Sequence, residues 1–297
     1  MCDQIEIARL ALGTLDVDYR PDISREELLR EVGSYDALVV RSRTKVDKEV
    51  IEKGSRLKLI ARPGTGLDNI DVESAKSRGI QVVNSPESLV EAVAEHVLLL
   101  MLAVSRRLVE SANSTKSGRW EKNALTGTEL KGKTLGIVGL GRIGRRIGEI
   151  ARVMGMSIVV YDVIPLAPEV LAEIGAKVVD LDSLFTSSDF VTLHVPLTES
   201  TKGLVDTRRL SLMKKESVVI NTSRGGVVDE NALSTALAEG RIRGAGLDVF
   251  AQEPPVGRIL SATNAILTPH IGGQTVEAQY DAVTIIGEKV RTFFSGA

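Results

Sequence analysis

The sequence has one cysteine, Cys2, in 297 residues, and aromatic residues make up only 3% of the chain. A single cysteine cannot build an internal disulfide framework, which excludes the disulfide-rich secreted class and fits a reducing compartment. Lysine and arginine number 37 against 39 acidic residues, so the net charge is −2 and offers no basic field for nucleic acid. We therefore expect a cytoplasmic protein without a nucleic-acid partner, packed mainly through aliphatic side chains.

Long apolar runs and clustered metal ligands are also scarce. The most apolar stretch, residues 97–104, has eight residues, whereas a membrane-spanning helix needs about 20. The N-terminus shows no signal-peptide pattern. The three histidines and the cysteine do not stand at metal-ligand spacing. The sequence predicts neither a membrane partner nor a bound metal.

The clearest positive signal is a glycine-rich turn after a short apolar run. Residues 134–138 have the length of a strand, and Gly139, Gly141 and Gly144 follow in G-x-G-x-x-G spacing. The first glycine permits a tight turn, the second lets the backbone approach a pyrophosphate, and the third lets helix and strand pack closely. The helix that follows offers unpaired N–H groups to phosphate at its N-terminus. The pattern predicts a dinucleotide-binding turn.

An acidic residue stands where such a turn requires one. Asp162 follows a second apolar run, residues 157–161, and lies 23 residues after Gly139. A carboxylate at this place accepts hydrogen bonds from the ribose hydroxyls and repels a 2′-phosphate. The glycine motif alone is compatible with an ordinary turn. With the strand, the helix and the acid in place, we predict a dinucleotide site that prefers NAD over NADP.

Apolar runs of strand length alternate with helical patterns along the chain, which indicates an α/β fold with parallel sheets. In the first part, strands are expected at residues 15–19, 37–40, 57–61 and 80–83, and helices at 5–12 and 24–32. Ser24 and Glu27 form a capping pattern at the start of the latter. Later strands are expected at 134–138, 157–161, 177–179, 189–193, 217–220, 244–247 and 265–267. Long helices are expected at 89–109, 229–239 and 276–294, and residues 111–130 are expected to form an extended arm.

Polar residues or glycines follow the three later strands of the first part. They are Arg41, Ser42, Arg43, Arg62, Gly64, Gly66 and Asn84. Because ligands bind at the carboxyl ends of strands in open parallel sheets, we expect these residues to share one site. The C-terminal helix is expected to fold back onto this first lobe.

Two residues near the C-terminal end form the strongest candidate for proton transfer. His270 follows the run 265–267 and precedes Gly272 and Gly273, a pair that allows close approach of a ligand. Glu253 lies 17 residues earlier and is followed by two prolines that fix the backbone. A carboxylate hydrogen-bonded to a histidine fixes its tautomer and stabilises the imidazolium, as a general acid/base requires. Each residue alone is typical of a loop; together they predict a catalytic pair.

An arginine and two further histidines complete the candidates. Arg224 follows a strand end and precedes two glycines, and its guanidinium can grip a carboxylate in two places. A solvated turn arginine is the alternative. His194 ends the run 189–193 and is assigned either to the cofactor or to a structural role. His96 lies in an apolar helix and is expected to be a buried or interface histidine.

Five segments together resemble the D-isomer-specific 2-hydroxyacid dehydrogenases. They are residues 139–144 (GLGRIG), 221–230 (NTSRGGVVDE), 246–250 (GLDVF), 253–255 (EPP) and 268–273 (TPHIGG). The resemblance implies two doubly wound parallel-sheet lobes. A Rossmann-type NAD domain over 87–273 is inserted into a flavodoxin-like substrate domain formed by 1–86 and 274–297. It also implies a homodimer or higher homo-oligomer, built through the NAD domain and an arm near 110–130.

The resemblance also implies roles for individual residues, with Arg224, Glu253 and His270 as the catalytic triad. The residues expected at NAD, from the resemblance or from their place in a motif, are Thr65, Gly139, Gly141, Arg142, Ile143, Gly144, Asp162, His194, Pro196, Thr222, Ser223, Asp248, Gly272 and Gly273. The residues expected at the substrate are Arg41, Ser42, Arg43, Arg62, Gly64, Gly66, Asn84 and Gln274. Arg224 would hold the substrate carboxylate with the backbone of residues 64–66. His270 would take the hydroxyl proton as hydride passes to the nicotinamide, and Asp248 would orient the carboxamide.

Within the family, four segments are most similar to members that act on D-3-phosphoglycerate: residues 41–45 (RSRTK), 62–69 (RPGTGLDN), 120–121 (WE) and 127–133 (GTELKGK). This similarity implies NAD-dependent oxidation of D-3-phosphoglycerate to 3-phosphohydroxypyruvate, the first step of serine biosynthesis. A glyoxylate or hydroxypyruvate reductase, or another D-2-hydroxyacid dehydrogenase, is the alternative within the class. A catalytically idle, NAD-sensing binding protein similar to transcriptional corepressors is the alternative from another class.

The chain departs from the family pattern in three ways. No segment of strand length precedes the helix expected over 5–12, Pro63 replaces a usual small residue, and no regulatory domain follows Ala297. The first departure suggests a truncated or misassigned start. The third predicts that serine does not regulate the protein.

Overall fold

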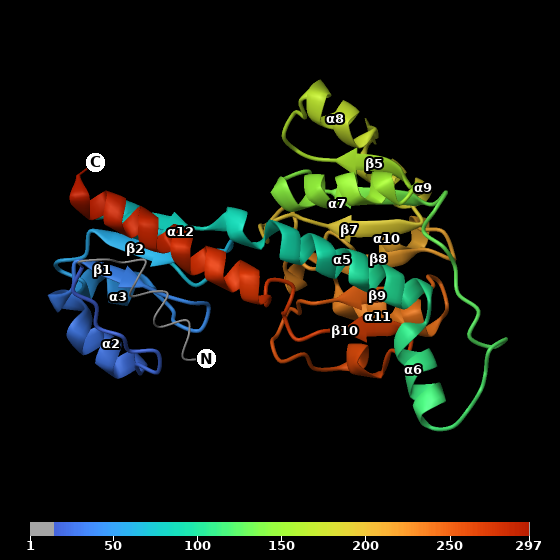
Figure 1. The fold of residues 1–297 in the computed structure, drawn as a ribbon, viewed down its shortest axis with the longest axis horizontal. Coiled ribbons are helices and arrows are strands. Elements are labelled where there is room, and N and C mark those ends of the chain that lie inside the picture. Colours follow the sequence, from blue (N-terminus) through green and yellow to red (C-terminus); the bar gives the residue numbers. More distant parts are fainter. Residues whose placement is uncertain (1–14, 297) are drawn as a thin grey trace. The chain divides into compact units, whose positions relative to one another are not determined.

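In the computed structural model, residues 15–296 are described, and the chain divides into two compact units (Figure 1). Unit 1 consists of the chain through Val90 together with the segment from Gly273 onward, and unit 2 of Glu91–Gly272. Each unit contains one parallel β-sheet with helices packed on it, so the α/β fold class is confirmed. The helix predicted over 5–12 lies outside the described residues.

The sheet of unit 2 has seven parallel strands in the order β10-β9-β8-β7-β4-β5-β6 (Figure 1). This is the doubly wound order of a dinucleotide-binding fold extended by a seventh strand. The winding direction changes at β4, which pairs with β5 on one side and with β7 on the other. The strands are β4 (Thr134–Val138), β5 (Ser157–Tyr161), β6 (Ala176–Val178), β7 (Phe190–Leu193), β8 (Val218–Asn221), β9 (Gly244–Leu247) and β10 (Ala265–Leu267).

Helices cover both faces of this sheet because its strands are apolar on both sides. On β8, Val219 belongs to the cluster with α9, α10 and α11, whereas Val218 and Ile220 belong to the cluster with α5 and α7. The helices of unit 2 are α5 (Val90–Ser105, its first residue still in unit 1), α6 (Leu108–Lys116), α7 (Arg142–Val153), α8 (Pro168–Ile174), α9 (Leu181–Ser187), α10 (Thr207–Leu212) and α11 (Glu230–Ala238), with short 3₁₀ turns η3 (Gly225–Val227) and η4 (Arg258–Ser261).

The single long helix predicted over 89–109 is wrong, because the structure divides it. Helix α5 ends at Ser105, and Arg107 adopts a left-handed conformation with φ 49° before α6 begins. Helix α6 also takes up residues 111–116 of the predicted extended arm, so only residues 117–130 are irregular. A left-handed residue interrupts the i→i−4 hydrogen bonds although the apolar pattern continues through it.

The stretch 86–105 is long and apolar enough, by length and composition, to cross a membrane, with mean hydropathy 1.7. The uninterrupted run 97–104 understates this length, because apolar residues continue between charged ones toward the N-terminus. More than half of the stretch is buried. Val97, Leu100 and Met101 of α5 pack into the core of unit 2. A core helix of a globular domain passes the same test, so the finding is weak evidence for a membrane.

Within the described residues, unit 1 contains a three-stranded parallel sheet in the order β1-β2-β3. On β2, Leu59 and Ala61 face a cluster with the C-terminal helix, whereas Ile60 faces the cluster of α2, α3 and α4. The helix is thus part of unit 1, as predicted. The elements are α2 (Arg25–Glu31), η1 (Val32–Ser34), β1 (Ala37–Val39), α3 (Lys48–Lys53), β2 (Leu59–Arg62), α4 (Val72–Ser77), β3 (Gln81–Asn84), η2 (Pro86–Leu89) and α12 (Val276–Ser295).

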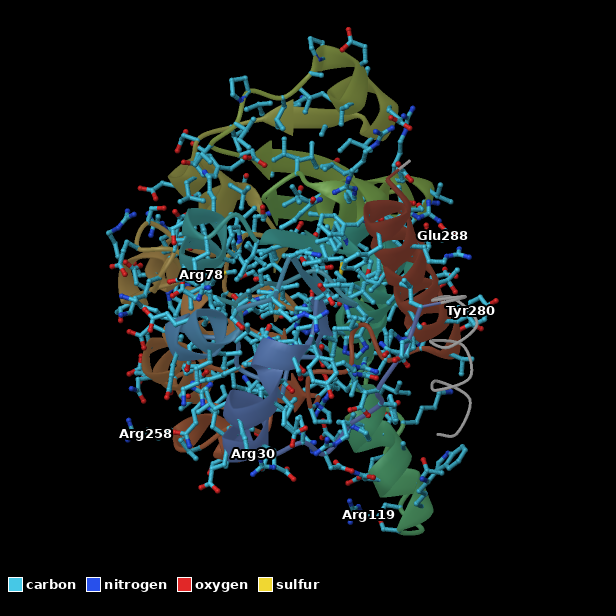
Figure 2. All side chains as sticks on the ribbon, turned by 90° about the vertical axis from the view of Figure 1, so that its left-hand side faces the viewer. Arg30, Arg78, Arg119, Arg258, Tyr280 and Glu288 are labelled. Atoms are coloured by element: carbon cyan, nitrogen blue, oxygen red, sulfur yellow. The ribbon has the colours of Figure 1, made fainter. Side chains whose placement is uncertain are left out.

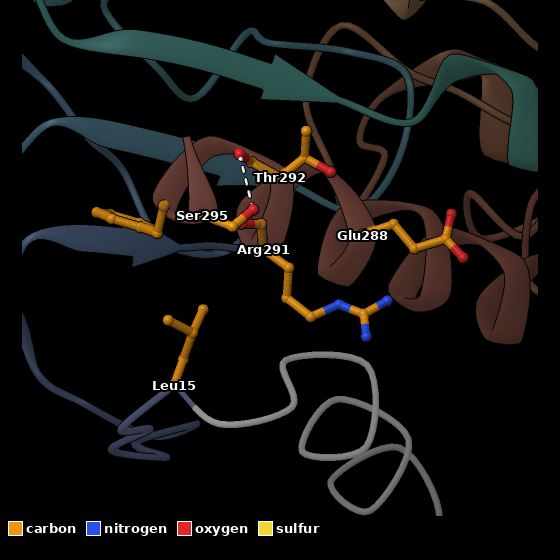
Figure 3. Close-up of a pocket in the computed structure, with 6 residues that line it drawn as sticks. Leu15, Glu288, Arg291, Thr292 and Ser295 are labelled. Atoms are coloured by element: carbon orange, nitrogen blue, oxygen red, sulfur yellow. Dashed lines mark hydrogen bonds between the residues drawn. The ribbon is translucent and has the colours of Figure 1, made fainter. Parts of the chain in front are cut away.

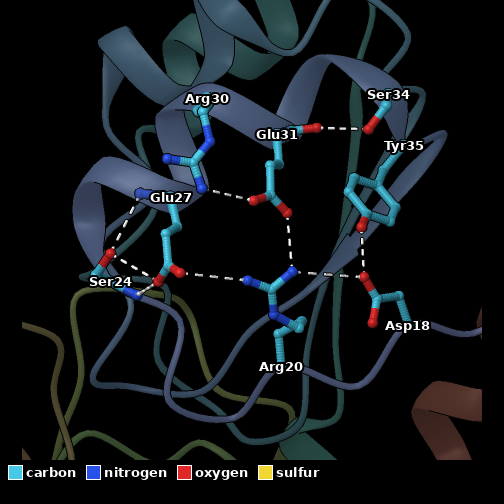
Figure 4. Close-up of polar contacts among 8 residues, drawn as sticks. All are labelled: Asp18, Arg20, Ser24, Glu27, Arg30, Glu31, Ser34 and Tyr35. Carbon is cyan, nitrogen blue, oxygen red and sulfur yellow. Dashed lines mark hydrogen bonds and ion pairs between the residues drawn. The ribbon is translucent and has the colours of Figure 1, made fainter.

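Helix α2 begins with the capping pattern predicted for Ser24 and Glu27. The Ser24 side chain accepts a hydrogen bond from the backbone N–H of Glu27, whose carboxylate accepts one from Ser24 N–H (Figure 4). Residues 15–19, by contrast, do not form the predicted strand. The segment is held instead by side chains: Tyr35 Oη donates to Asp18 at 2.5 Å, and Arg20 contacts the carboxylates of α2.

A hollow in unit 1 lies along the last turns of α12. Its lining is formed by Leu15, Glu288, Arg291, Thr292, Phe294 and Ser295 (Figure 3). None of these is a predicted site residue, so the hollow does not mark the predicted substrate site.

Long side chains such as Arg258 and Tyr280 project at the outside of the molecule (Figure 2).

Candidate active site

The glycine-rich turn after β4 has the conformation that its spacing predicts. Gly139 has φ +91°, and a Cβ there would lie 2.6 Å from the carbonyl oxygen of His194. A Cβ on Gly144 would lie 2.2 Å from the carbonyl oxygen of Gly139, so this position requires glycine for helix α7 to pack against the turn. A Cβ on Gly141 meets nothing within 4 Å. The space beside Gly141, at the start of α7, is what a pyrophosphate needs.

Asp162 lies at the carboxyl end of β5 and is held by two backbone groups. One carboxylate oxygen accepts the N–H of Leu140 at 2.7 Å and the other accepts that of Ile164 at 2.9 Å. These contacts join the acid to the glycine-rich turn. Each oxygen retains a lone pair for a ribose hydroxyl. Val163 and Ile164 beside it are strongly exposed apolar side chains, which a flat apolar ring would cover.

His194 follows β7, the strand on the other side of the change in winding direction. Its Nε2 lies 3.0 Å from Thr192 Oγ1, and burial lowers its pKa to about 4. The ring is therefore neutral at physiological pH. The chain then turns away at Pro196, whose carbonyl oxygen accepts from Thr201 Oγ1. His194 and the glycine-rich turn thus meet at the carboxyl ends of β4 and β7.

The loop after β8 holds Arg224 through its neighbours. Asn221 Nδ2 donates to the Arg224 carbonyl oxygen at 2.9 Å, and Asn221 Oδ1 accepts from Ser223. A Cβ on Gly225 would lie 1.8 Å from the carbonyl carbon of Phe250, so glycine is required for the loops after β8 and β9 to pack together. Thr222 Oγ1 is buried and has no hydrogen-bond partner. An unpaired buried hydroxyl beside Arg224 is a group that a bound ligand would satisfy.

The loop after β9 carries Glu253 and is tied to the start of helix α11. The N–H of Ala251 donates to Glu230 Oε1 at 2.5 Å, and the N–H of Phe250 donates to Glu253 Oε1 at 3.3 Å. The peptide bond between Glu253 and Pro254 is cis. Because Gly225 contacts the backbone of Phe250, Arg224 and Glu253 are carried on two loops in direct backbone contact.

His270, after β10, lies against Glu253 as predicted from the sequence. Its Nδ1 is 2.9 Å from Glu253 Oε2 and 3.1 Å from Oε1. Both side chains are about half exposed. Since the carboxylate accepts a hydrogen bond from Nδ1–H, the opposite ring nitrogen, Nε2, can exchange a proton with a substrate. His270 has φ +55°, one of two non-glycine residues with positive φ among residues 15–296.

Asp248, at the end of β9, is almost fully buried and contacts the segment that carries His270. Its Oδ1 accepts from Thr268 Oγ1 at 2.6 Å and from the N–H of Ile271 at 2.9 Å, and its Oδ2 accepts the N–H of Gly272 at 2.7 Å. Burial by itself would raise the pKa of Asp248. The hydrogen bonds from His96, Thr268 and the two backbone groups outweigh burial and lower that pKa.

The residues predicted to bind substrate all belong to unit 1, as does Thr65, which was predicted at NAD. Arg41, Ser42 and Arg43 follow β1, Arg62 ends β2 with Gly64, Thr65 and Gly66 after it, Asn84 ends β3, and Gln274 precedes α12. Hydrogen bonds join the loops after β2 and β3: Asn84 Nδ2 donates to the Thr65 carbonyl oxygen at 2.6 Å, and Ser85 Oγ accepts the N–H of Gly64 at 2.9 Å.

Individual predicted residues of unit 1 differ in their surroundings. Arg41 Nη2 donates to Gln279 of α12 at 2.5 Å. Arg43 donates to the Pro21 carbonyl and to Asp22, in a strongly exposed ion pair. Thr65 Oγ1 is buried without a hydrogen-bond partner. Substrate and cofactor roles for these residues stay predictions.

Several positioning residues were not identified from the sequence. Glu230, Asn221 and Thr268 hold the loops of Arg224, Glu253 and His270 in unit 2, and Ser85, Asn69 and Gln279 hold those of unit 1. All but Ser85 and Gln279 lie inside motif segments that carried the resemblance. Their partners are distant in sequence, so the motif marks them without indicating their role. In the part of the chain that the structure describes, no three metal-ligating side chains are grouped to hold a metal ion.

The sheet order, the glycine-rich turn and the ribose-type acid define unit 2 as a dinucleotide-binding domain with a His–Glu pair at its strand ends. Residues 98–272 match the family described as D-isomer specific 2-hydroxyacid dehydrogenase, NAD binding domain. The chain belongs to this family, and its cofactor is NAD.

The chain is 45% identical over 281 residues to a D-3-phosphoglycerate dehydrogenase of Synechocystis sp., covering 94% of this chain and 50% of the relative. It is 46% identical over 272 residues to a hydroxypyruvate reductase of Thermotoga maritima, covering 90% and 88%. A D-lactate dehydrogenase from Aquifex aeolicus, crystallised with NAD and lactic acid, superposes with TM-score 0.89 at 30% identity, covering 99% and 93%. The chain spans about half the length of the D-3-phosphoglycerate dehydrogenases it matches.

We predict that His194 makes the folded protein less stable in mild acid. Its pKa is about 4 in the folded chain against an ordinary 6.5, so between these values only the unfolded chain binds the proton. Stability then falls as pH decreases from 6.5 toward 4, by on the order of 1–2 kcal/mol at pH 5. Urea unfolding at pH 7 and pH 5 should show a smaller difference for His194→Gln than for wild type. Equal differences in the two proteins would contradict the assignment.

Proposed function

We propose that this protein is an NAD-dependent D-2-hydroxyacid dehydrogenase, with Arg224, Glu253 and His270 as its catalytic residues. The observation that carries the proposal is the contact of His270 Nδ1 with Glu253, 2.9 Å, at the strand ends of an NAD-binding domain. Backbone contact between the loops of Arg224 and Glu253 supports it. A His–carboxylate pair, with an arginine on a loop in contact with that of the carboxylate, is suited to moving a proton on a carboxylate-bearing substrate.

The chain's own residues divide the work. Arg224 binds the carboxylate of the 2-hydroxy acid through its planar, permanently charged guanidinium. His270 Nε2 accepts the proton of the 2-hydroxyl during oxidation and returns it during reduction. Glu253 keeps the Nδ1 proton in place, so that the ring presents the correct nitrogen, and it stabilises the imidazolium that forms. Bound NAD supplies the acceptor for the hydride leaving C2.

The residues present fit the nicotinamide cofactor. The space beside Gly141 admits a pyrophosphate close to the backbone, and Asp162 is held with acceptors for ribose hydroxyls. The buried, unpaired hydroxyl of Thr222 is a further group for the bound cofactor to satisfy. We propose that these three residues, with Arg142 and Ile143 at the start of α7, hold NAD. An acid in the place of Asp162 disfavours NADP.

For the substrate we propose D-3-phosphoglycerate, oxidised to 3-phosphohydroxypyruvate in serine biosynthesis. Support comes from relatives named D-3-phosphoglycerate dehydrogenase at about 45% identity and from the arginines after β1 and β2. We propose that Arg41 and Arg43 bind the phosphate, with the other predicted residues of unit 1 around it. The relative named hydroxypyruvate reductase, at 46% identity, favours an unphosphorylated keto acid as the second candidate. The cytoplasm is the proposed location.

We also propose that the protein forms a homodimer through unit 2. Leu99 and Leu102 on α5 and Leu108 and Val109 on α6 are large apolar side chains left exposed, and Trp120 is 84% exposed. Arg119 beside it projects outward beyond the end of α6 (Figure 2). Several large apolar side chains left exposed within residues 99–120 favour an interface with another chain.

The proton-transfer role predicts a large loss of turnover in His270→Ala. We expect kcat to fall by about two to four orders of magnitude, because no other group replaces the general acid/base. NADH affinity, measured by fluorescence titration, should change little and serves as the folding control. A variant that retains nearly full turnover would exclude this role for His270.

The substrate proposal is tested by NADH oxidation with 3-phosphohydroxypyruvate, hydroxypyruvate and glyoxylate. We expect kcat/KM to favour the phosphorylated acid by about a hundredfold or more, equivalent to roughly 2.7 kcal/mol. Arg41→Gln should lose most of this preference, whereas Arg25→Gln, whose guanidinium pairs with Asp47, should keep it. A preference for an unphosphorylated acid would overturn the substrate but keep the reaction. Absence of turnover despite NADH binding would favour the idle binding protein.

The dimer is tested through Trp120, the only tryptophan in the sequence. Sedimentation velocity should give twice the 31.9 kDa chain mass, and the emission of Trp120 should shift to the red on dissociation as the indole becomes hydrated. Leu99→Glu places a charge in the proposed interface and should weaken association. A wild-type chain that sediments as a monomer at micromolar concentration would contradict the proposal.

A further inference from the structure

A buried polar cluster lies behind the segment that carries His270, and the proposed mechanism does not use all of it. Its members are His96 on α5, Asp248 after β9, and Thr268 after β10. His96 is 8% exposed and Asp248 is 1% exposed. His96 Nε2 is 3.1 Å from Thr268 Oγ1 and 3.4 Å from Asp248 Oδ1. Polar groups buried this deeply are retained at a cost in stability unless all are paired.

The hydrogen bonds assign the tautomer of His96. Thr268 has a single hydroxyl proton, which it donates in a short 2.6 Å hydrogen bond to Asp248 Oδ1. Thr268 Oγ1 is then an acceptor toward His96, so Nε2 of His96 carries a proton and donates. The positive end of the His96 Nε2–H dipole therefore lies near the carboxylate of Asp248, which is almost fully shielded from water.

Asp248 in turn fixes the backbone on the C-terminal side of His270. It accepts the N–H groups of Ile271 and Gly272, the two residues that follow His270. On the other side, the N–H of His270 donates to the Thr268 carbonyl oxygen at 3.0 Å. A left-handed backbone is unfavourable at a residue with a Cβ, because the Cβ crowds the following carbonyl oxygen. The φ of +55° at His270 therefore needs these contacts to be maintained.

A Cβ on Gly272 would lie 3.0 Å from Asp248 Oδ2 and 3.7 Å from both His96 Cδ2 and Val93 Cγ2. The segment thus lies directly on the cluster, and its conformation follows the place of the Asp248 carboxylate. Without the His96 donor, the Asp248 carboxylate would move toward water. The N–H groups of Ile271 and Gly272, which it accepts, would move with it.

We propose that His96 is a positioning residue, which acts through Thr268 and Asp248 to hold segment 268–272 so that His270 faces Glu253. The inference rests on the proposed function, since it assigns to His270 the proton transfer. It goes beyond the family resemblance, which gives His96 no role. An ordinary buried histidine would stabilise the fold without affecting the geometry of His270 in particular.

The experiment compares four single variants of the full chain. His96→Leu removes the donor at similar volume, and His96→Gln keeps an N–H donor at the place of Nε2. Thr268→Val removes the bridging hydroxyl without touching α5. Ser105→Ala is the matched control, because it also removes a buried hydrogen bond of α5, from Ser105 Oγ to the Met101 carbonyl oxygen at 2.7 Å, outside the cluster.

Two measurements are made on each variant. Hydrogen exchange of the apo protein reports the Ile271 and Gly272 amides directly, and steady-state assays report kcat and KM with NADH and the best keto acid. For His96→Leu and Thr268→Val we expect faster exchange at these two amides and a kcat lower by about 10- to 100-fold, with KM for NADH changed less than about threefold. His96→Gln should recover most of kcat, and Ser105→Ala should resemble wild type in both measurements.

Unchanged exchange at Ile271 and Gly272 in His96→Leu would overturn the inference, whatever the stability of the variant. So would a His96→Gln protein as impaired as His96→Leu, because the donor would then be irrelevant. Equal losses in Ser105→Ala would show a general effect of α5 and would also contradict it. If the wild type turns over no keto acid, the proposed function fails, and the exchange rates alone decide whether His96 holds the segment.

Discussion

Parallel pairing of seven strands is the constraint on which the rest of unit 2 depends. In a parallel sheet every strand ends at the same edge, so each loop that follows a strand opens toward the same region. The pairing of β4 with β7 places the glycine-rich turn beside His194, and the pairing of β8, β9 and β10 brings three further loops together. Gly139 and His194, 55 positions apart in the sequence, therefore become neighbours through strand pairing.

A common sheet edge alone would not give these loops the defined conformation that catalysis needs. Close backbone contacts and buried carboxylates supply it. Gly225 lets the loop of Arg224 contact the backbone at Phe250 where any side chain would collide. Glu230 and Asp248 accept N–H groups of the loops that carry Glu253 and His270. Each carboxylate replaces backbone partners that a loop lacks, which is how a segment without secondary structure acquires a defined conformation.

Prediction from the sequence succeeded where the determinants are local. The strands predicted from residue 37 onward, the cap at Ser24 and the glycine turn follow from short-range sterics and hydrogen bonding, and these are found in the structure. It failed where a tertiary contact overrides the local pattern. The apolar periodicity of 89–109 continues through Arg107, yet Arg107 adopts a left-handed conformation, and Gly127 packs against the backbone at Ser105 and Arg106. Residues 15–19 have strand composition, but Tyr35 hydrogen-bonds to Asp18, and Leu15 and Val17 pack on the cluster of β2 and α12.

The fold class, the dinucleotide turn and the pairing of His270 with Glu253 could be predicted from the sequence, because they depend on glycine spacing, apolar periodicity and residue chemistry within short segments. The groups that hold these residues in place could not be predicted, because they depend on tertiary contacts. His96 is separated from Thr268 by 172 positions, and nothing in either segment indicates the other. Their contact exists because α5 covers one face of the sheet while β10 closes its edge, and such a juxtaposition follows from packing of the whole unit.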